Sequence, residues 1–294
     1  LPMRINPERL REVLSSRGHA DLAEVMLKDS RPGLALETTP AEDELIAIGA
    51  SKLGGSPDLP AQTEWPQSDG RPMEFLAQID LSEVAERASH LAFPQAGLLS
   101  FFYDYKNSPW GSEPKDRSGF RVILSAASSD LERRPRPASP LDDPDMMTSF
   151  EPHAVAFEEI TSIPPSCFDA DEIVALDGDE SASEGFAEAL EESEEGGGTR
   201  HQMFGFPHPV QEPCHEFESA VMTRGGHAEA PRLDPAIRAQ AEQEAPHWQL
   251  LLQLDTDESA GWMWGDVGTL YFMVHKDALA AGDFSNVWCI LQCC

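Results

Sequence analysis

Apolar residues in this chain follow two different spacings, and the change from one to the other marks the predicted elements. In residues 8–28, leucine, valine and methionine recur every three or four positions, which predicts two short helices separated by Gly18. The first begins at Asn6-Pro7, where an asparagine cap precedes a proline at the first helical position. Beyond Gly33, short apolar runs bounded by glycine and proline predict strands.

These runs indicate a fold made mostly of strands. The predicted strands are residues 34–37, 44–48, 75–80, 98–103, 120–125, 249–254, 269–274 and 287–291. Two further short helices, at residues 81–90 and 276–281, each follow a strand, and residues 52–60 form a Gly/Pro loop. We therefore predict an α+β fold of mostly antiparallel β-sheet with flanking short helices.

Three short motifs occur twice in the same order. A Gly-x-Pro turn, an apolar-Gln-apolar-Asp strand and a Gly-x-Leu-x-Phe strand lie at residues 55–57, 75–80 and 97–101, and again at 205–207, 250–255 and 268–272. Three ordered matches predict an internal duplication, with two halves related by a pseudo-twofold axis and sharing one core. The predicted units are an N-terminal helical segment (1–33), a first β-rich half (34–150) and a second (151–294), the halves forming one compact domain.

Charge limits the partners that we expect. The 294 residues include 52 Asp and Glu against 21 Lys and Arg, a net charge of −31. Such a field repels phosphate backbones and anionic headgroups, so neither nucleic acid nor a membrane is expected as a partner. Solubility, or a salt-rich habitat, explains the charge ahead of the alternative, a basic protein partner. No apolar run approaches the roughly 20 residues of a membrane span, no hydrophobic leader opens the chain, and five scattered cysteines indicate reduced thiols. We expect a cytoplasmic protein.

An acidic insertion at residues 169–198 separates the halves. It contains twelve Asp and Glu, has no Lys or Arg, and closes with three glycines. Mutual repulsion and thin apolar cover predict a solvated, mobile surface segment, because little buried area offsets the entropy of ordering it. Its charge density leaves open a role in attracting a cationic partner.

Gln78 and Gln253 are the most unusual polar residues of the repeat, because each lies in an apolar strand. A buried glutamine must satisfy its amide donors and its acceptor, so we expect each to bind the backbone or a ligand. We favour the interpretation that they lock the two halves across the pseudo-twofold. Asp80 and Asp255 end the same strands, where capping of the next turn is favoured over an acid–base or metal pair.

The segment Trp-Met-Trp-Gly-Asp at residues 262–266 has no counterpart in the first half. Two indole faces beside a carboxylate suit recognition of a cation or a peptide, so Trp264 and Asp266 are candidate ligand-binding residues, together with His201, Gln78 and Gln253. The alternative is that both rings fill the core while Asp266 holds a turn.

Metal and standard catalytic motifs are not expected. A group of histidines with one cysteine lies at irregular spacing among prolines, which does not favour a tetrahedral zinc site: His201, His208, Cys214, His215 and His227. The sequence also lacks a glycine-rich phosphate loop, a nucleophile elbow and a zincin motif. We predict no metal and no cofactor.

Several motifs together resemble the YwqG-like family of bacterial proteins. They are residues 51–60, 64–66, 75–81, 97–102, 201–207, 250–257 and 263–266, with the C-terminal 283–294. The resemblance covers residues 34–294 and departs at Phe204-Gly205, where the family pattern favours Gly-Gly, which implies a stiffer loop. It implies an α+β fold with internal duplication, no settled activity and, from neighbouring bacterial toxin systems, an immunity-like binding role.

The function we predict is binding without catalysis. The acidic charge, the missing catalytic motif and the resemblance favour a binding protein for a basic protein partner, of the immunity type. The alternative is an enzyme or small-ligand-binding protein with a pocket near Trp264 and Asp266. The sequence leaves the oligomeric state open.

Overall fold

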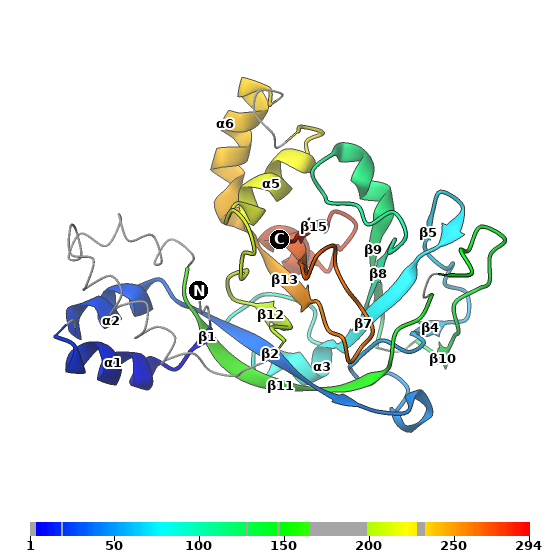
Figure 1. Cartoon of the computed structure of the whole chain (residues 1–294), viewed down its shortest axis with the longest axis horizontal. Coiled ribbons are helices and arrows are strands. Elements are labelled where there is room, and N and C mark those ends of the chain that lie inside the picture. The colour runs from blue at the N-terminus through cyan, green and yellow to red at the C-terminus, as the bar shows by residue number, and fades with distance from the viewer. Residues whose placement is uncertain (1–3, 19, 128, 146–147, 165–198, 228–232) are drawn as a thin grey trace.

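The computed structural model describes residues 4–18, 20–127, 129–145, 148–164, 199–227 and 233–294 (Figure 1). The strands are β1 (Arg4–Ile5), β2 (Arg31–Pro40), β3 (Lys52–Leu53), β4 (Asp58–Pro60), β5 (Gln67–Ser68), β6 (Arg71–Pro72), β7 (Glu74–Asp80), β8 (Leu98–Tyr103), β9 (Phe120–Ser125), β10 (Leu131–Arg133), β11 (His153–Ser162), β12 (Gln202–Phe204), β13 (Trp248–Asp255), β14 (Thr269–His275) and β15 (Trp288–Gln292). The helices are α1 (Pro7–Ser16), α2 (Ala20–Lys28), α3 (Leu81–Ala85), α5 (His215–Met222), α6 (Pro235–Glu244) and α7 (Lys276–Ala281), with 3-10 turns η1 (Asp43–Leu45), η2 (Pro114–Gly119) and η5 (Ala245–His247).

One antiparallel sheet holds most of the strands. Its order is β15-β14-β13-β12-β2-β11-β3-β7-β8-β9, and β1 pairs with the end of β11. β2 and β11 pair over ten residues, from His153 opposite Pro40 to Ser162 opposite Arg31, and form the long ribbon across the lower part of Figure 1. The predicted α+β class with a mostly antiparallel sheet is confirmed.

On each side of the central pair, β2 and β11, four strands follow in a matching order. β12 joins β2 and leads through β13 and β14 to β15, while β3 joins β11 and leads through β7 and β8 to β9. The repeated motifs occupy matching places, since the glutamine strands are β7 and β13 and the Gly-x-Leu-x-Phe motifs run into β8 and β14. Both glutamine strands shift register at the same point, between Phe75 and Ala77 and between Leu250 and Leu252.

The two Gly-x-Pro loops also share an unusual backbone. Gly54 and Gly55 have φ angles of 63° and 66°, and Phe204 and Gly205 have 59° and 69°. A phenylalanine in this left-handed region is strained, because its Cβ crowds the backbone. The buried ring of Phe204 packs 5.7 Å from that of Phe93, and this packing offsets the strain.

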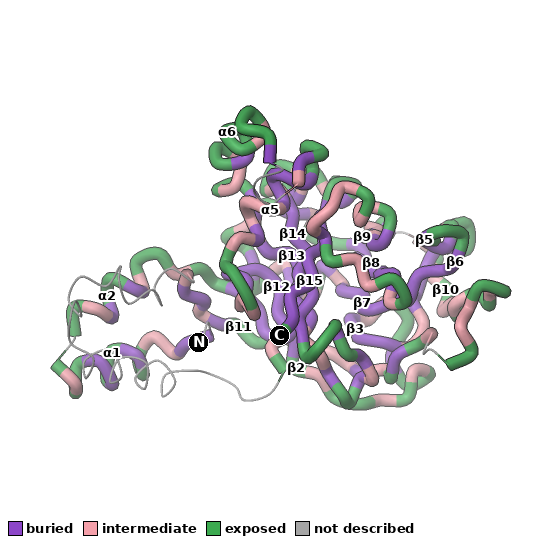
Figure 2. The backbone as a smooth tube through the Cα atoms, turned by 45° about the horizontal axis from the view of Figure 1, so that its top comes forward, coloured by how far each residue is buried: buried purple, intermediate pink, exposed green. Residues whose placement is uncertain are grey.

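The sheet has two arms, β12-β13-β14-β15 beside β2 and β3-β7-β8-β9 beside β11, and it curves so that these arms pack against each other. Phe101 of β8 meets Phe272 of β14 with ring centroids 5.1 Å apart, and Phe120 of β9 meets Trp288 of β15 at 5.3 Å. The Trp288 indole also donates a hydrogen bond to the carbonyl of Gly111, beyond β8. Figure 2 shows the buried stretches of these strands together in the middle of the molecule. Contacts between the arms thus form the core.

The N-terminal segment attaches to this sheet through β1. As predicted, it contains two short helices, and these bury a small apolar cluster of their own: Ile5, Leu10, Val13, Leu14, Ala23, Met26 and Ile163. The Asn6 side chain caps α1 by accepting from Arg9 N. Arg4 extends from β1 and donates to the carbonyl of His201 and to Gln202. At the other end of the sheet, α5 packs on β13, β14 and β15 and also contacts α6.

Some local predictions were wrong. Residues 44–48 contain the end of η1 in place of a strand, because Leu45 and Ile48 are exposed and Ile46 alone among the apolar residues is buried. The helix predicted at 81–90 is assigned only as far as Ala85. Residues 52–60, predicted as a loop, contribute β3 and β4, and the long strand β11 was not predicted.

Two further predictions concern the surroundings of the fold. In the part of the chain that the structure describes, the helices are all too short or too polar to cross a bilayer. The acidic insertion predicted at residues 169–198 lies outside the described residues.

Gly54 gives a test of the loop geometry. A Cβ at Gly54 would overlap the carbonyl of Glu151, whereas Gly18, also at positive φ, has open space around it. We expect Gly18→Ala to cost roughly 1 kcal/mol of unfolding free energy from backbone strain alone, and Gly54→Ala at least about 2 kcal/mol more from the clash. Urea unfolding of both variants measures the difference, and equal losses would contradict the close approach at Gly54.

Candidate functional site

Gln78 holds one Gly-x-Pro loop from within the sheet. Its side chain is completely buried on β7. Oε1 accepts a hydrogen bond from Asp58 N at 2.8 Å, while Nε2 donates to Ala50 O at 2.8 Å and to Asp58 Oδ2 at 2.7 Å. The amide therefore uses its donors and its acceptor, as burial requires, and fixes the loop at both ends.

Gln253 makes the same contacts in the second half. Its Oε1 accepts from His208 N at 2.9 Å and its Nε2 donates to Arg200 O at 2.9 Å. Arg200 and His208 lie 150 positions after Ala50 and Asp58, so the two contacts match residue for residue.

The interpretation that the two glutamines lock the halves to each other is wrong. Each binds the backbone of the loop in its own half, because the irregular loop leaves buried N–H and C=O groups that no strand partner satisfies. Both amides are occupied by protein groups, so the structure places Gln78 and Gln253 inside the loop supports and not on a ligand-accessible surface.

A second matched contact places His201. Asp80 N donates to Ser51 Oγ at 2.9 Å, and Asp255 N donates to His201 Nδ1 at 3.1 Å, so the imidazole occupies the place of the Ser51 hydroxyl. Because the ring is longer, its Nε2 reaches Asp257 Oδ2 at 3.3 Å. His201 is completely buried.

His201 belongs to a buried polar chain. Asp257 Oδ1 accepts from the Ser259 hydroxyl at 2.6 Å, and that hydroxyl lies 3.2 Å from His153 Nε2. The hydrogen bond from His201 and those from Ser259 hold the pKa of Asp257 well below its usual range, against the opposing effect of burial. The chain joins β11, β12 and the turn after β13, and its two histidines are at most 1% exposed. Both histidines are enclosed, and the chain reaches solvent at its exposed Ser259 end.

The Trp264 ring lies in the core. It is 1% exposed and is surrounded by other aromatic rings, with centroid distances of 5.4 to 6.2 Å to Trp262, Tyr105, Tyr103 and Phe150. Asp266, two residues later, is exposed. The structure thus separates the carboxylate from the indole faces that were expected to act with it. The core-filling alternative describes Trp262 and Trp264.

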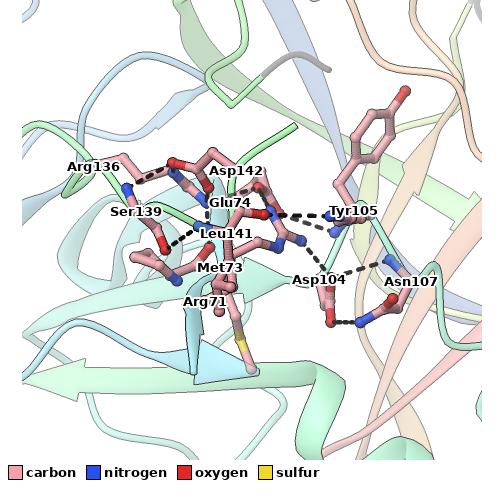
Figure 3. Close-up of polar contacts among 12 residues, drawn as sticks. Arg71, Met73, Glu74, Asp104, Tyr105, Asn107, Arg136, Ser139, Leu141 and Asp142 are labelled. Atoms are coloured by element: carbon pink, nitrogen blue, oxygen red, sulfur yellow. Dashed lines mark hydrogen bonds and ion pairs between the residues drawn. The ribbon is translucent and has the colours of Figure 1, made fainter. Parts of the chain in front are cut away.

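A buried cluster of charges lies at the far end of β7 and β8 (Figure 3). Arg71 donates to Glu74 at 2.7 Å and to Asp104 at 2.6 Å, and all three residues are buried. Arg136 forms a two-bond contact with Asp142 at 2.8 and 2.9 Å and approaches Glu74 at 3.4 Å. This arrangement fastens the Pro-rich loop around residues 134–144 to the sheet.

The cluster sets the protonation of its carboxylates. Burial raises the pKa of Glu74, although Tyr105 N and Arg71 oppose the shift. Burial alone would also raise the pKa of Asp104. Hydrogen bonds from Ser68, Asn107 and Arg71 outweigh burial and lower the pKa of Asp104. For Asp142 the Arg136 hydrogen bonds dominate and lower the pKa to about 2. A smaller cavity of about 270 Å³ lies beside Asp104 and Asn107.

A larger cavity of about 450 Å³ opens at the opposite ends of these strands. Loop residues 47–50, the residues just before β8 and the turn after β9 form its walls, with Asp80 and Glu83 contributing carboxylates and Leu131 and Ile48 apolar surface. We call it the acidic groove. The residues that line it, all within the described part of the chain, include no lysine or arginine.

The acidic groove marks a difference between the halves. Asp255, the counterpart of Asp80, has both carboxylate oxygens engaged, by Arg200 N at 2.7 Å and by the Thr269 hydroxyl at 2.6 Å. Asp80 uses Oδ1 to cap Ser82, and its Oδ2 makes no hydrogen bond among the described residues. One carboxylate of the repeat is thus occupied internally, whereas the other belongs to a residue that lines the groove and has one oxygen without a hydrogen bond among the described residues. The predicted capping role holds for Asp80.

The fold and these sites define an α+β protein built on one antiparallel sheet, with buried polar supports and an acidic groove. Residues 51–293 match the model of DUF1963, a domain of unknown function, and the chain belongs to this family. No curated protein matches the sequence. An uncharacterised family was expected from the resemblance, and this is confirmed; the narrower YwqG-like kinship stays a prediction.

Several of these residues were not predicted as functional. Arg71, Glu74, Asp104 and Arg136 come from three separate segments of the chain. The pairing of β7 with β8 brings the first three together, and the loop after β10 adds Arg136. One signal was available: Glu74 and Asp104 flank apolar strands and would be buried with them if those strands paired.

The glutamine supports predict a stability effect. Gln78→Leu and Gln253→Leu keep the buried volume but leave loop N–H and C=O groups without partners, so each should lower the unfolding free energy by about 2 to 4 kcal/mol. Urea unfolding measures the loss. Gln240→Leu, on the exposed side of α6, is the control and should change stability little. A loss of the same size in all three variants would contradict the role assigned to the amides.

The low pKa of Asp142 predicts a loss of folding stability in acid. Its folded-state pKa of about 2 lies below the roughly 3.9 of an unfolded aspartate, so the contact with Arg136 contributes stability above about pH 4 that is lost as pH falls toward 2. Asp142→Asn should therefore be less stable than the wild type at pH 7, and the two should converge at low pH. Denaturant unfolding across this range tests it against Asp130→Asn, an exposed control. A constant difference at every pH would contradict the assignment.

Proposed function

We propose that this protein is a non-catalytic binding protein of the YwqG-like, immunity type, and that its acidic groove receives a cationic side chain of a basic protein partner. The observation that carries the proposal is the lining of the groove: two carboxylates, apolar surface from Ile48 and Leu131, and no cation. An arginine or lysine places its aliphatic stem on apolar surface and its charged head on a carboxylate, so the groove complements both parts of such a side chain.

The distribution of charge supports a cationic partner. Several basic side chains are turned inward and neutralise carboxylates of their own chain. Lys52 is completely buried and reaches Asp43 at 2.6 Å, and Arg133 donates to Asp58 at 2.9 Å. The carboxylates in excess of these cations give the chain its net charge of −31, and such a field attracts cationic proteins over long range.

Hydrogen bonds of the repeated motif hold the wall of the groove in place. Gln78 fixes the carbonyl of Ala50, Ser51 accepts from Asp80 N, and both Ala50 and Asp80 line the groove. A wall supported from the buried sheet is pre-organised, which lowers the entropic cost of binding. Two related halves with one open carboxylate also support an origin by internal duplication followed by divergence.

The alternative of an enzyme or ligand pocket near Trp264 gains no support from this geometry. Aromatic rings cover the indole, and His201 is committed to Asp255 and Asp257. We therefore place the binding function at the groove.

Charge reversal in the groove tests the proposal. Glu83 lines the groove, whereas Glu86 lies on the surface three residues later and does not. We expect Glu83→Lys to weaken binding of a short oligo-arginine peptide by roughly tenfold, and the matched control Glu86→Lys to have a much smaller effect. Affinity is measured by calorimetry at low and at physiological salt, and salt should weaken the wild-type complex.

A second variant separates the groove from the acidic insertion. Deleting residues 177–197 and joining the ends with a Gly/Ser linker removes most carboxylates of that segment and should leave the effect of Glu83→Lys in place. If the deletion abolished peptide binding while Glu83→Lys and Glu86→Lys behaved alike, the groove would not be the binding site.

A further inference from the structure

Three potential metal ligands meet at the other arm of the sheet. Glu244 ends α6, His247 ends η5 and His275 ends β14, and one ligand atom from each lies within 4.8 Å of the other two. His275 Nε2 is 3.3 Å from Glu244 Oε2, and the rings of His247 and His275 are 5.7 Å apart. His247 is exposed and the other two are partly exposed, so the group is open to solvent.

Local structure fixes these residues in place. Pro246 lies inside η5 and restricts the turn that separates Glu244 from His247. Trp248 then enters β13 directly opposite His275 on β14, and its ring lies 5.9 Å from the imidazole. The strand pairing therefore positions His275 beside the turn, independently of any bound ion.

We propose that Glu244, His247 and His275 form a binding site for a single first-row transition-metal ion, with Zn²⁺ as the physiological occupant. Two imidazoles with one carboxylate suit zinc and its neighbours, whereas Ca²⁺ and Mg²⁺ prefer sites made of oxygen ligands. Three protein ligands leave a fourth position for water or another ligand.

The distances are close to those that zinc needs. At metal–ligand bonds of about 2.0–2.1 Å, the ligand atoms around a tetrahedral ion lie roughly 3.4 Å apart. The pair from His275 and Glu244 already has this separation, at 3.3 Å. The ligand atom of His247 lies within 4.8 Å of the other two, and this exposed side chain must move closer to complete the set.

Neighbouring groups can orient two of the ligands. Arg224 lies 3.6 Å from Glu244 Oε1 and leaves Oε2 toward the histidines. In the metal-free arrangement His275 Nδ1 accepts from Asp277 N at 3.2 Å, so the proton of the neutral ring is on Nε2. Metal binding through Nε2 would move that proton to Nδ1, which would give up the hydrogen bond from Asp277 N and face the Asp277 carboxylate, 3.9 Å away. A carboxylate behind a metal-bound histidine is a common supporting contact.

At the equivalent strand end of the first half, an arginine occupies the place of a bound cation. By the alignment of the Gly-x-Leu-x-Phe motifs, His275 corresponds to Asp104. In the first half Arg71 supplies the positive charge beside Asp104 and Glu74. In the second half a carboxylate and two imidazoles converge, and the acidic field of the chain raises the local concentration of cations.

The test is a zinc titration of the full chain, stripped of metal. Accessible thiols are alkylated first, because Cys294 is exposed and binds zinc well. Magnesium is present throughout to occupy weak carboxylate sites. Calorimetry should give one zinc per chain, and His247→Ala and Glu244→Gln should each weaken binding by roughly tenfold or more. His275 is not substituted because its side chain caps α7, and its loss would also affect that helix.

His90→Ala is the matched control, since His90 is an exposed histidine at a different place in the fold, and its zinc affinity should equal that of the wild type. A second readout is the visible spectrum of bound Co²⁺, which should show nitrogen and oxygen ligation in the wild type and be lost in His247→Ala. Circular dichroism checks that each variant is folded. Zinc binding unchanged in both His247→Ala and Glu244→Gln, or the lack of a saturable site in the wild type, would overturn the proposal.

Discussion

The rest of the structure depends on how two irregular loops satisfy their buried backbone groups. The Gly-x-Pro segments leave the sheet through residues in the left-handed region, so their N–H and C=O groups cannot join the regular ladder. In each half one buried glutamine supplies an acceptor to the far end of the loop and a donor to the near end. The short strands β3 and β12, which join the arms to β2 and β11, lie within these loops. Without the glutamines, the links between arms and centre would carry unpaired polar groups.

Buried charge is the second constraint. Lys52, Arg71 and Arg136 are removed from water and are tolerated because each contacts a carboxylate within 2.6 to 2.8 Å. Such pairs contribute little net stability over apolar residues, but removing one partner leaves a buried charge uncompensated. Because each of these cations is held against a carboxylate, the pairs remove little net charge, and the net charge of −31 is carried by the rest of the chain.

The two halves share the glutamine hydrogen bonds that support their loops, and they differ in the polar side chains at their strand ends. Asp255 is used internally, whereas its counterpart Asp80 faces a groove. At the other end of the arms, Asp104 is neutralised by Arg71, whereas His275 stands beside Glu244 and His247. These differences between the halves lie at strand ends. The groove and the Glu244–His247–His275 cluster both lie at such ends.

The sequence by itself determined the fold class and much of the local structure. Apolar runs predicted most of the strands in both arms, and the requirement that a buried amide be satisfied predicted that Gln78 and Gln253 would be hydrogen-bonded. Only the tertiary structure decided what those amides bind. It also decided that Trp264 fills the core, since the rings around it come from distant segments.

The pairing of β2 with β11 and the Glu244–His247–His275 group were likewise invisible in the sequence. For the charge cluster of the first half the only signal was that Glu74 and Asp104 flank apolar strands. The physical reason is the same in each case. Periodicity reports which face of an element is apolar, and it contains no information about which distant element will pack against that face. Side chains such as Glu74 and Asp104, or Glu244 and His275, become a site only when strand pairing and sheet curvature bring separate strand and helix ends to one place.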